Sequence, residues 1–398
     1  HCADKYRLHP HIRFGTSVNG ARFDEASGLW HLDTSNGPIT ARALITATGQ
    51  LNRPAWPNLP GRDRFAGETF HSARWDHDVD LTGKTVAVIG TGASAIQFVP
   101  EIAKQAKQVL LFQRSAPYVI PKPDRPYSAT EQRLMARFPL LQKLDRARVY
   151  AQNEARVLGF TSLQGAMRFH EYLFKKHLRE CVPDPDTRAK LTPDYPMGCK
   201  RILISNDYYQ ALTKYRIPVI TGGVRAITAD GVEDIDGEHH QADVIIYGTG
   251  FQATDFLAPM TITGRRGQDL NQAWRDGAEA YLGITVHGFP NLFMLYGPNT
   301  NLGHNSIIYM IESQIAYVVS ALETLERDGH RFVDVRPGVQ DDFNRRLQAR
   351  MRDTVWDQGC ESWYKTASGK NTNNWPGFTF SYRQRTRHLD PEDYELHP

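Results

Sequence analysis

The sequence lacks long apolar runs. Its longest mostly apolar stretches resemble Thr85–Ile89 and Val244–Tyr247, which are of strand length, whereas a helix needs about 20 apolar residues to cross a bilayer. It also lacks an excess of one charge, because 47 Lys and Arg residues against 44 Asp and Glu residues leave a net charge of +3. Bulk charge therefore gives no support for binding to nucleic acid or to an anionic membrane, and we expect no transmembrane segment.

Cysteine is scarce as well. The four cysteines, Cys2, Cys181, Cys199 and Cys360, are far apart and form no CxxC pair. The spacing therefore predicts neither a zinc knuckle nor a dithiol redox motif. Isolated thiols are more typical of a reducing cytosol than of a secreted fold held by disulfides, so we expect a cytoplasmic protein.

Apolar residues are plentiful, since 40% of the 398 residues are hydrophobic and 11% are aromatic. This content excludes disorder and is enough for two domains, or for one large domain with insertions. Thr85–Ile89 is a β-branched run, apolar positions between Ile96 and Ala106 fall at helical spacing, and Val109–Phe112 is a second apolar run. Strand, helix and strand in this order predict one βαβ unit.

Further elements are predicted on both sides of this unit. A helical pattern covers residues 128–182, and strand signals return at Ile217–Ile220 and Asp243–Tyr247, so a helical block is expected to interrupt an α/β domain. Nearer the N-terminus we expect a turn at Val18–Gly20 and short strands at Ile12–Phe14, Ala21–Phe23, Trp30–Leu32 and Ala43–Gly49. Nearer the C-terminus we expect a strand at Leu292–Tyr296 and a helix over Ser306–Arg327 that buries Ile307, Met310, Ile311 and Ile315.

A glycine-rich loop joins the predicted strand and helix of the βαβ unit. The pattern is GxGxxA, and its candidate ligands for a dinucleotide are Gly90, Thr91, Gly92, Ala93, Ser94 and Ala95, with Gln97 in the helix that follows. The first glycine permits the tight turn, the second lets a pyrophosphate approach the backbone, and the small third residue lets the helix pack on the strand. A turn with a purely structural role is the alternative, but the strand and helix context favours a dinucleotide site.

The end of the second strand indicates which dinucleotide is bound. Sites for NAD place an acidic residue about 20 residues after the loop, where it holds the ribose 2′-hydroxyl. This chain has Gln113-Arg114-Ser115 there and no carboxylate. An Arg fork suits the 2′-phosphate of NADP, so we expect Arg114 and Ser115 to bind NADP; a solvated surface Arg114 is the alternative.

A second pattern precedes the loop and is more specific. Phe65, Gly67, His71, Trp75 and Asp76 resemble the FxGxxxHxxxW[PD] fingerprint of the Baeyer–Villiger monooxygenases. Without the resemblance, His71 is a hydrogen-bonded linker residue, and no metal-ligand set accompanies it. Related flavin monooxygenases that oxygenate N or S usually have another residue at the Trp75-Asp76 position.

The resemblance spans nearly the whole chain and implies cofactors, a reaction and site residues. The family binds FAD and NADPH and inserts one oxygen atom of O₂ beside a ketone carbonyl through a flavin peroxide, giving an ester or a lactone. In this chain the resemblance implies that His71 belongs to the cofactor site, Lys200 joins Arg114 on the 2′-phosphate, and Arg201 lies over the flavin, where a fixed cation stabilises anionic oxygen. It also implies that Asn299 lies on the flavin side and that Trp363 covers the nicotinamide. The alternatives are an ordinary basic dipeptide for Lys200-Arg201 and a surface position for Trp363.

The implied fold is α/β, with two nucleotide-binding Rossmann-like domains and a helical insertion; the FAD domain is incomplete at its N-terminus and the NADP domain is complete. Ala47-Thr48-Gly49 and Gly248-Thr249-Gly250 resemble the paired crossovers between these domains. The expected division is residues 1–50 for the rear part of the FAD domain, 51–80 for a linker with the fingerprint, 81–123 for the first part of the NADP domain, 124–196 for the helical insertion, 197–250 for the second part of the NADP domain, and 251–398 for the C-terminal part of the FAD domain and the active-site cover.

Two family features are missing from the sequence. Residues 1–86 contain no first GxGxxG for FAD, and no Gly-Gly-x-Trp motif occurs; the chain also begins with His1 rather than Met. We therefore expect an N-terminally incomplete chain that acts on a small-molecule ketone with O₂. An N- or S-oxygenating enzyme and a non-catalytic NADP-binding fragment are the alternatives, whereas a disulfide reductase would need a CxxC pair. Substrate identity and oligomeric state are not predicted.

Overall fold

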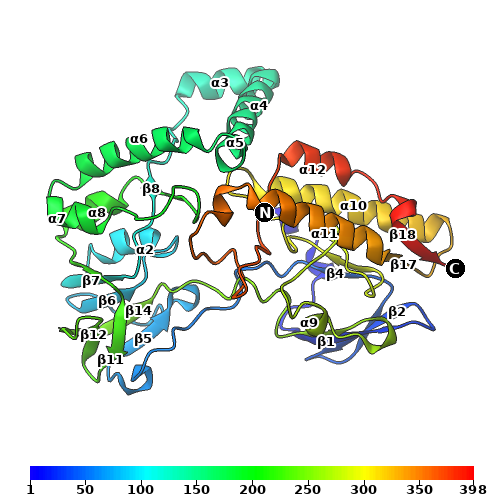
Figure 1. Cartoon of the computed structure of the whole chain (residues 1–398), viewed down its shortest axis with the longest axis horizontal. Coiled ribbons are helices and arrows are strands. Elements are labelled where there is room, and N and C mark those ends of the chain that lie inside the picture. The colour runs from blue at the N-terminus through cyan, green and yellow to red at the C-terminus, as the bar shows by residue number, and fades with distance from the viewer.

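A five-stranded parallel sheet lies at the centre of one of two lobes in the computed structural model, which describes residues 1–398 (Figure 1). The strand order is β10 (Val219–Thr221), β7 (Gln108–Gln113), β6 (Thr85–Ile89), β14 (Val244–Tyr247) and β5 (Glu68–His71). The βαβ unit predicted from the sequence is present, with α2 (Ala95–Ile102) between β6 and β7. We call residues 54–251 the parallel-sheet lobe.

The two faces of this sheet are covered by different elements. Because successive residues of a strand face opposite sides, Val86 and Val88 of β6 pack against α2 and α8 (Tyr208–Lys214). Ala87 and Ile89 face the other way, towards an antiparallel sheet of β11 (Val224–Ile227), β12 (Gly231–Asp234) and β13 (His239–Gln241). All four β6 side chains are less than one-tenth exposed, which explains why the sequence of this strand is apolar throughout.

The fingerprint segment, expected to be a linker, includes a strand. Residues 68–71 form β5, which pairs in parallel with β14 at the edge of the sheet, with His71 opposite Tyr247. The pairing brings two backbones together at Gly67, where a Cβ atom would come within 2.3 Å of the Asp243 carbonyl oxygen. Glycine is therefore required at this position by close approach of the chain.

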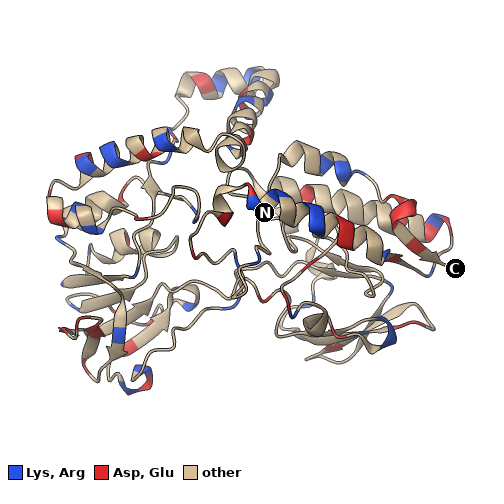
Figure 2. Cartoon of the chain, in the orientation of Figure 1, with Lys and Arg blue, Asp and Glu red and all other residues tan.

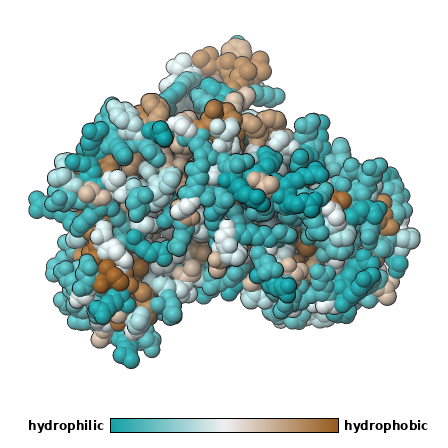
Figure 3. Space-filling view, in the orientation of Figure 1, coloured by the Kyte–Doolittle hydropathy of each residue, from teal (hydrophilic) through white to brown (hydrophobic).

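A group of helices extends from the parallel-sheet lobe. They are α3 (Ala129–Arg137), α4 (Pro139–Ala155), α5 (Val157–Phe160), α6 (Gly165–Cys181) and α7 (Pro185–Lys190), and α3 and α4 project from the molecule at the top of Figure 1. Helix α3 begins with a capping box in which the Ser128 hydroxyl accepts a hydrogen bond from the Glu131 N–H. The strands β8 (Val119–Ile120) and β9 (Leu203–Ile204), which pair in parallel, flank this insertion. Exposed apolar side chains gather on the projecting hairpin (Figure 3), among them Phe138, Leu140 and Leu144.

The remaining residues, 1–53 and 252–398, form what we call the mixed-sheet lobe. Its four-stranded sheet has the order β15 (Thr261–Thr263), β1 (Val18–Asp24), β2 (Leu29–Thr34) and β3 (Ile39–Ala41); smaller sheets pair β16 (Leu292–Met294) with β4 (Leu44–Thr46) and β17 (Phe332–Val335) with β18 (Tyr394–His397). Its helices are α1 (Cys2–Lys5), α9 (Leu270–Ala273), α10 (Ile307–Arg327), α11 (Pro337–Arg352) and α12 (Thr379–Arg385). Helices α10, α11 and α12 cover the sheets on one side (Figure 1).

Some local predictions for this lobe are wrong. Ile12–Phe14 is not a strand, and Val18–Gly20 is not a turn but the start of β1. Gly20 pairs with Thr261 of β15 so closely that a Cβ atom would come within 2.9 Å of the Thr261 carbonyl oxygen. The glycine therefore serves the pairing with a strand that is distant in the sequence.

Helix α10 forms where it was predicted, but of the four side chains expected to be buried only Met310 is, since Ile307 and Ile311 are half-buried. Ile315 is 44% exposed, whereas Gln314 is fully buried. The Gln314 side chain accepts a hydrogen bond from the Tyr296 N–H and donates one to the Tyr382 hydroxyl. A polar residue is buried here because its amide is satisfied on both sides, which an apolar periodicity does not reveal.

Charge and hydropathy agree with the composition. Lys and Arg residues are interspersed with Asp and Glu residues over both lobes (Figure 2). None of the helices combines the length and the apolar character that a bilayer crossing requires.

Two linkers connect the lobes and lie antiparallel to each other. The Ala55 N–H donates to the Gly250 carbonyl (2.9 Å), and the Gln252 N–H donates to the Arg53 carbonyl (3.0 Å). The Thr249 hydroxyl also donates to the Ala55 carbonyl (2.6 Å). The chain therefore enters and leaves the parallel-sheet lobe through one short ladder of hydrogen bonds.

A buried carboxylate joins the helical insertion to the mixed-sheet lobe. Glu154, at the end of α4, accepts hydrogen bonds from the Thr379 N–H (2.5 Å), the Thr379 hydroxyl (2.8 Å), the Asn305 amide (2.5 Å) and the Phe380 N–H (3.3 Å). Its side chain is only 6% exposed. Four donors on one buried carboxylate fix the insertion against the start of α12.

We expect Glu154→Ala to destabilise the protein by about 2–3 kcal/mol, because it leaves buried donors without an acceptor. A lower midpoint of urea unfolding, followed by circular dichroism, would show this. Glu101→Ala is the matched control, since Glu101 is exposed and pairs only with Lys104 on the same helical turn. Equal midpoints for the two variants would contradict the role of Glu154.

Candidate functional site

The glycine-rich loop lies at the carboxyl ends of β6 and β14. Gly90 has φ +109°, which side chains rarely allow, and a Cβ atom there would come within 2.4 Å of the Gly248 carbonyl oxygen. The Gly248 N–H in turn donates to the Ile89 carbonyl (2.8 Å). These contacts hold the loop in the crevice beside the first strand of the βαβ unit, where parallel sheets bind nucleotides.

The loop presents free hydrogen-bond donors. The backbone N–H groups of residues 91–94 make no hydrogen bond within the chain, and a Cβ atom on Gly92 would meet nothing within 4 Å. The Gln97 amide donates back to the Ala93 carbonyl (2.7 Å), and the Thr91 hydroxyl donates to the Ser115 carbonyl (3.3 Å). Unpaired N–H groups at the start of α2, with open space beside Gly92, fit a pyrophosphate.

Two alanine substitutions in this loop should have different effects. We expect Gly90→Ala to lower the free energy of unfolding by about 2–3 kcal/mol or more, because the positive φ and the close backbone contact both oppose a Cβ atom. Gly92→Ala should leave the unfolding midpoint unchanged and weaken NADP⁺ binding at least tenfold by blocking the approach of the pyrophosphate. Differential scanning fluorimetry and calorimetric titration with NADP⁺ measure the two effects. Unchanged NADP⁺ affinity in Gly92→Ala would remove the loop from the binding site.

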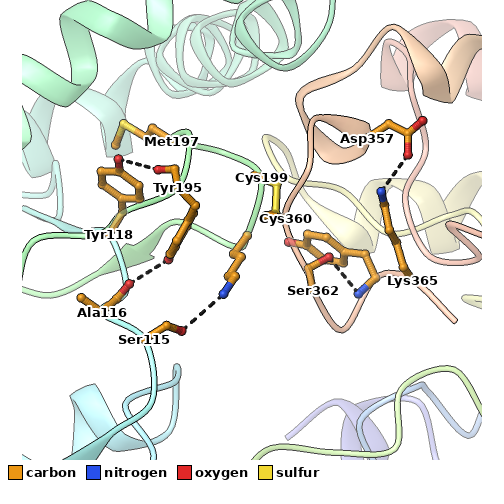
Figure 4. The surroundings of a disulfide bond; sticks show 12 residues. Ser115, Ala116, Tyr118, Tyr195, Met197, Cys199, Asp357, Cys360, Ser362 and Lys365 are labelled. Atoms are coloured by element: carbon orange, nitrogen blue, oxygen red, sulfur yellow. Dashed lines mark hydrogen bonds and ion pairs between the residues drawn. A yellow bond between two sulfur atoms is a disulfide. The ribbon is translucent and has the colours of Figure 1, made fainter. Parts of the chain in front are cut away.

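Arg114, Ser115 and Lys200 lie together beside the loop. Strands β8 and β9 run parallel with Val119 opposite Leu203, so the residues just before them lie side by side. The Lys200 ammonium donates to the Ser115 hydroxyl at 3.3 Å, the interaction drawn at Ser115 in Figure 4. Burial, and then the nearby charge of Arg114, lower the pKa of Lys200. Two cations beside a hydroxyl form a setting that fits a phosphate.

Arg201 follows Lys200 and lies within electrostatic reach of the mixed-sheet lobe. It is exposed, and its charge acts on two phenols of that lobe, the half-buried Tyr296 and the fully buried Tyr364, opposing the effect of burial on their pKa values. Burial nevertheless raises the pKa of Tyr296 to about 12, and its hydroxyl donates to the Asn301 side chain (2.8 Å). The two tyrosines were not predicted as site residues, because nothing local in the sequence sets them apart from core tyrosines.

Asn299 belongs to a buried network of amides. Its Nδ2 donates to the carbonyls of Asn371 (2.9 Å) and Asn374 (3.2 Å), while its Oδ1 has no partner. His304, in the same loop, is 6% exposed with both ring nitrogens unpartnered, and burial lowers its pKa to about 4. Gln50, which follows the neighbouring strand β4, is also buried with a free amide.

These polar groups follow the carboxyl ends of β4 and β16, which pair in parallel. Buried polar groups without a partner are costly unless a ligand satisfies them. The unpartnered atoms therefore fit the hydrogen-bonding edge of a flavin.

Trp363 and His71 occupy different surroundings. Trp363 is half-buried and packs on Tyr364, with ring centroids 4.4 Å apart. His71 is fully buried at the inter-lobe linkers, between Trp56 (5.3 Å) and Phe251 (6.0 Å). Its Nδ1 accepts a hydrogen bond from the Ala73 N–H, and burial lowers its pKa, so the ring is neutral near pH 7. His71 therefore lies in the hinge region rather than beside Arg114 and Lys200.

The expectation of four isolated cysteines is wrong. Cys199 and Cys360 form a disulfide, with Cα atoms 6.3 Å apart and a sequence separation of 161 residues (Figure 4). Cys2 and Cys181 remain free. Counting CxxC pairs detects only local dithiols, and this bond depends on the approach of two lobes.

Sequence comparison finds close relatives. A family model described as pyridine nucleotide-disulphide oxidoreductase matches residues 3–158. A Baeyer–Villiger monooxygenase of Pseudomonas aeruginosa is 48% identical over 398 residues, covering 99% of this chain and 76% of the relative. A Baeyer–Villiger monooxygenase of Streptomyces coelicolor is 43% identical, covering 100% of this chain and 77% of the relative.

Solved structures of the same kind superpose over nearly the whole chain. The enzyme OTEMO in complex with FAD and NADP gives a TM-score of 0.88 at 27% identity, covering 99% of this chain and 83% of that one. An oxidised steroid monooxygenase bound to NADP gives a TM-score of 0.86 at 30% identity, with the same coverages. The predicted α/β fold with two nucleotide-binding, Rossmann-like domains is thereby confirmed.

Proposed function

Since the chain belongs to the Baeyer–Villiger monooxygenase family, and is thus an FAD- and NADPH-dependent oxygenase, we propose which of its residues carry the conversion of a ketone into an ester or lactone. When bound, NADPH would supply the hydride, and FAD would supply the means to activate O₂, the source of the inserted oxygen atom. The observation that carries the proposal is the position of Arg201, next to the Arg114–Lys200 pair and within electrostatic reach of Tyr296 and Tyr364. In the division we propose, the parallel-sheet lobe holds NADP and the mixed-sheet lobe holds FAD.

The parallel-sheet lobe binds and orients the nicotinamide cofactor. The free N–H groups of residues 91–94 receive the pyrophosphate, with Gly90 and Ala95 shaping the turn and Gln97 bracing it. Arg114, Ser115 and Lys200 hold the 2′-phosphate. Burial, and then repulsion by Arg114, lower the pKa of Lys200, and a dianion between the two cations offsets both effects.

Arg201 stabilises negative charge on oxygen. A guanidinium stays protonated at any working pH and offers planar donors, so it stabilises the oxyanion that forms when a ketone carbonyl is attacked. On the mixed-sheet side its charge reaches the half-buried Tyr296 and the fully buried Tyr364.

Three further residues act around this centre. Trp363 covers the nicotinamide, and Asn299 holds the loop that carries Tyr296 and Asn301 on the flavin side. His71 acts at the inter-lobe linkers, where a neutral buried ring packs between Trp56 and Phe251. We also propose the cytoplasm as the location, which rests on the free thiols of Cys2 and Cys181.

The test is product analysis under ¹⁸O₂. The protein is incubated with NADPH and a panel of cyclic and acyclic ketones, and mass spectrometry follows incorporation of one labelled oxygen into an ester or lactone. We expect one NADPH consumed per labelled product. A phenazine N-monooxygenase of Lysobacter antibioticus is 28% identical over 435 residues, so tertiary amines and nitrogen heterocycles are tested in parallel. Labelled N-oxides together with unreacted ketones would overturn the proposal in favour of N-oxygenation.

A further inference from the structure

The disulfide connects the two segments to which the proposed function assigns the cofactors. Cys199 immediately precedes Lys200 and Arg201 in the parallel-sheet lobe. Cys360 lies three residues before Trp363 in the mixed-sheet lobe. One covalent bond therefore joins the two lobes, directly beside the residues proposed to bind NADP.

Each arm of the bond is held in place by contacts of its own. On one side, the Tyr195 hydroxyl donates to the Ala116 carbonyl (3.0 Å) and the Tyr118 hydroxyl donates to the Tyr195 carbonyl (2.9 Å). On the other side, the Lys365 ammonium pairs with Asp357 (2.7 Å) (Figure 4). The two arms therefore keep their local structures without the sulfur bond, as a bond that opens and closes reversibly requires.

The two sulfur atoms differ in exposure. Cys199 is fully buried, in an apolar cluster with Phe160, Trp356 and Tyr364, whereas Cys360 is half-buried at the margin of this cluster. A reagent from solvent therefore reaches Cys360 first, and Cys199 is placed to attack the modified sulfur.

We propose that Cys199 and Cys360 form a reversible thiol–disulfide site, oxidised by hydrogen peroxide and reduced by dithiols, that fixes the cover segment 360–364 to the Lys200-Arg201 loop. The consequence for NADP rests on the proposed function of these residues. In the disulfide form the cover segment cannot leave the loop, so bound NADP⁺ escapes more slowly than it does from the dithiol form.

The chemistry is balanced. The Cys360 thiolate attacks one oxygen of hydrogen peroxide, the O–O bond breaks, and a sulfenic acid forms while the other oxygen leaves as water after protonation. The Cys199 sulfur then attacks the sulfenic sulfur, the S–O bond breaks, and a second water leaves. Two thiols are oxidised by two electrons, and one peroxide is reduced to two waters. A dithiol reverses the bond by exchange and is itself oxidised to a disulfide.

The oxidant also has a source in the chemistry of this enzyme class. When NADPH reduces O₂ without transfer of oxygen to a ketone, the products are NADP⁺ and hydrogen peroxide. The thiol pair therefore meets peroxide when NADPH is consumed without a ketone. Under the same condition, slower release of NADP⁺ reduces further consumption of NADPH.

The test combines a chemical and a binding measurement. The protein is reduced with dithiothreitol, desalted, and treated with hydrogen peroxide or left untreated; differential alkylation and peptide mass spectrometry then identify each cysteine. NADP⁺ affinity and dissociation rate are measured by calorimetry and stopped-flow fluorescence for both forms. Cys199→Ser and Cys360→Ser test the pair, with Cys2→Ser and Cys181→Ser as matched controls on the free cysteines.

We expect peroxide to yield the 199–360 cross-linked peptide, and to slow NADP⁺ dissociation about tenfold, a typical coupling between two sites. Both effects should be absent from Cys199→Ser and Cys360→Ser and present in the controls. If Cys199 and Cys360 remain free to alkylation after peroxide, or if NADP⁺ dissociates equally fast from both forms, the inference is overturned. If a serine variant does not fold, the comparison of reduced with peroxide-treated wild-type protein tests the same inference.

Failure of the proposed function is recognised separately. A cross-linked peptide in a protein that oxidises no ketone would count against the reaction, not against the thiol pair. Ketone oxidation with permanently free thiols would count against the thiol pair alone.

Discussion

Replacing Arg201 with alanine is expected to lower the rate of oxygen transfer to a ketone by about 10²–10³-fold, the usual effect of removing one donor to an oxyanion. NADPH oxidation in the absence of ketone should remain within about threefold of the wild type, because the residues proposed to bind NADP, residues 90–97, Arg114, Ser115 and Lys200, are untouched. Steady-state product formation and stopped-flow absorbance of the flavin separate the two steps.

Two controls sharpen this result. Arg201→Lys keeps the charge but loses the planar donors, so we expect partial activity if charge dominates. Arg179→Ala removes an exposed arginine of α6 and should change neither step. Equal losses of NADPH oxidation and of oxygen transfer in Arg201→Ala would identify Arg201 as a binding residue and not as an oxyanion stabiliser.

The second large effect concerns the choice between NADPH and NADH. Arg114→Ala and Lys200→Met should each raise the KM for NADPH about 10- to 100-fold, because each removes a charged hydrogen bond to the 2′-phosphate. The KM for NADH, which lacks this phosphate, should stay unchanged. In the wild type the Lys200 ammonium lies 4.5 Å from the centre of the Tyr195 ring. Lys200→Met removes this charge and keeps an apolar side chain beside the ring.

The measurement is the ratio of kcat/KM values for the two cofactors, with Lys104→Ala as the control. Lys104 is an exposed lysine in the turn after α2 that pairs only with Glu101. A wild-type preference for NADPH in Arg114→Ala would remove that residue from the 2′-phosphate site. Similar losses with NADPH and NADH would indicate a general disturbance of the loop.

Elements that depend on near neighbours could be predicted from the sequence. Strand β6 has the predicted bounds and α10 begins one residue after its predicted start, because apolar periodicity and turn residues act locally. The strand at Ile12–Phe14 and the turn at Val18–Gly20 were wrong. Val18 pairs with Thr34 of β2, and Gly20 pairs with both β2 and Thr261 of β15. Partners that are hundreds of residues away leave no local pattern.

The candidate site also contains residues that local sequence predicts and residues that it does not. The loop from Gly90 to Ala95 follows from its own spacing, and the approach of Lys200 to Ser115 was implied only by the family resemblance. Tyr296, Tyr364 and the Cys199–Cys360 bond were missed because each owes its position to residues distant in the sequence: Tyr296 bonds to Gln314, and Tyr364 packs with Cys199 across the lobes. The roles of the site residues and the domain boundaries stay predictions for the experiments above to decide.

The antiparallel linkers have a consequence for engineering of the chain. Residues 53 and 252 are joined by a 3.0 Å hydrogen bond, so the 198 or so residues between them form a guest module inserted into a loop of its host. Because its ends already meet, removing or exchanging the guest costs the host almost no loop-closure entropy. The architecture therefore suits grafting of a foreign cofactor module with similarly adjacent ends, provided that the module also supplies an acceptor for the Asn305 and Thr379 donors that Glu154 satisfies.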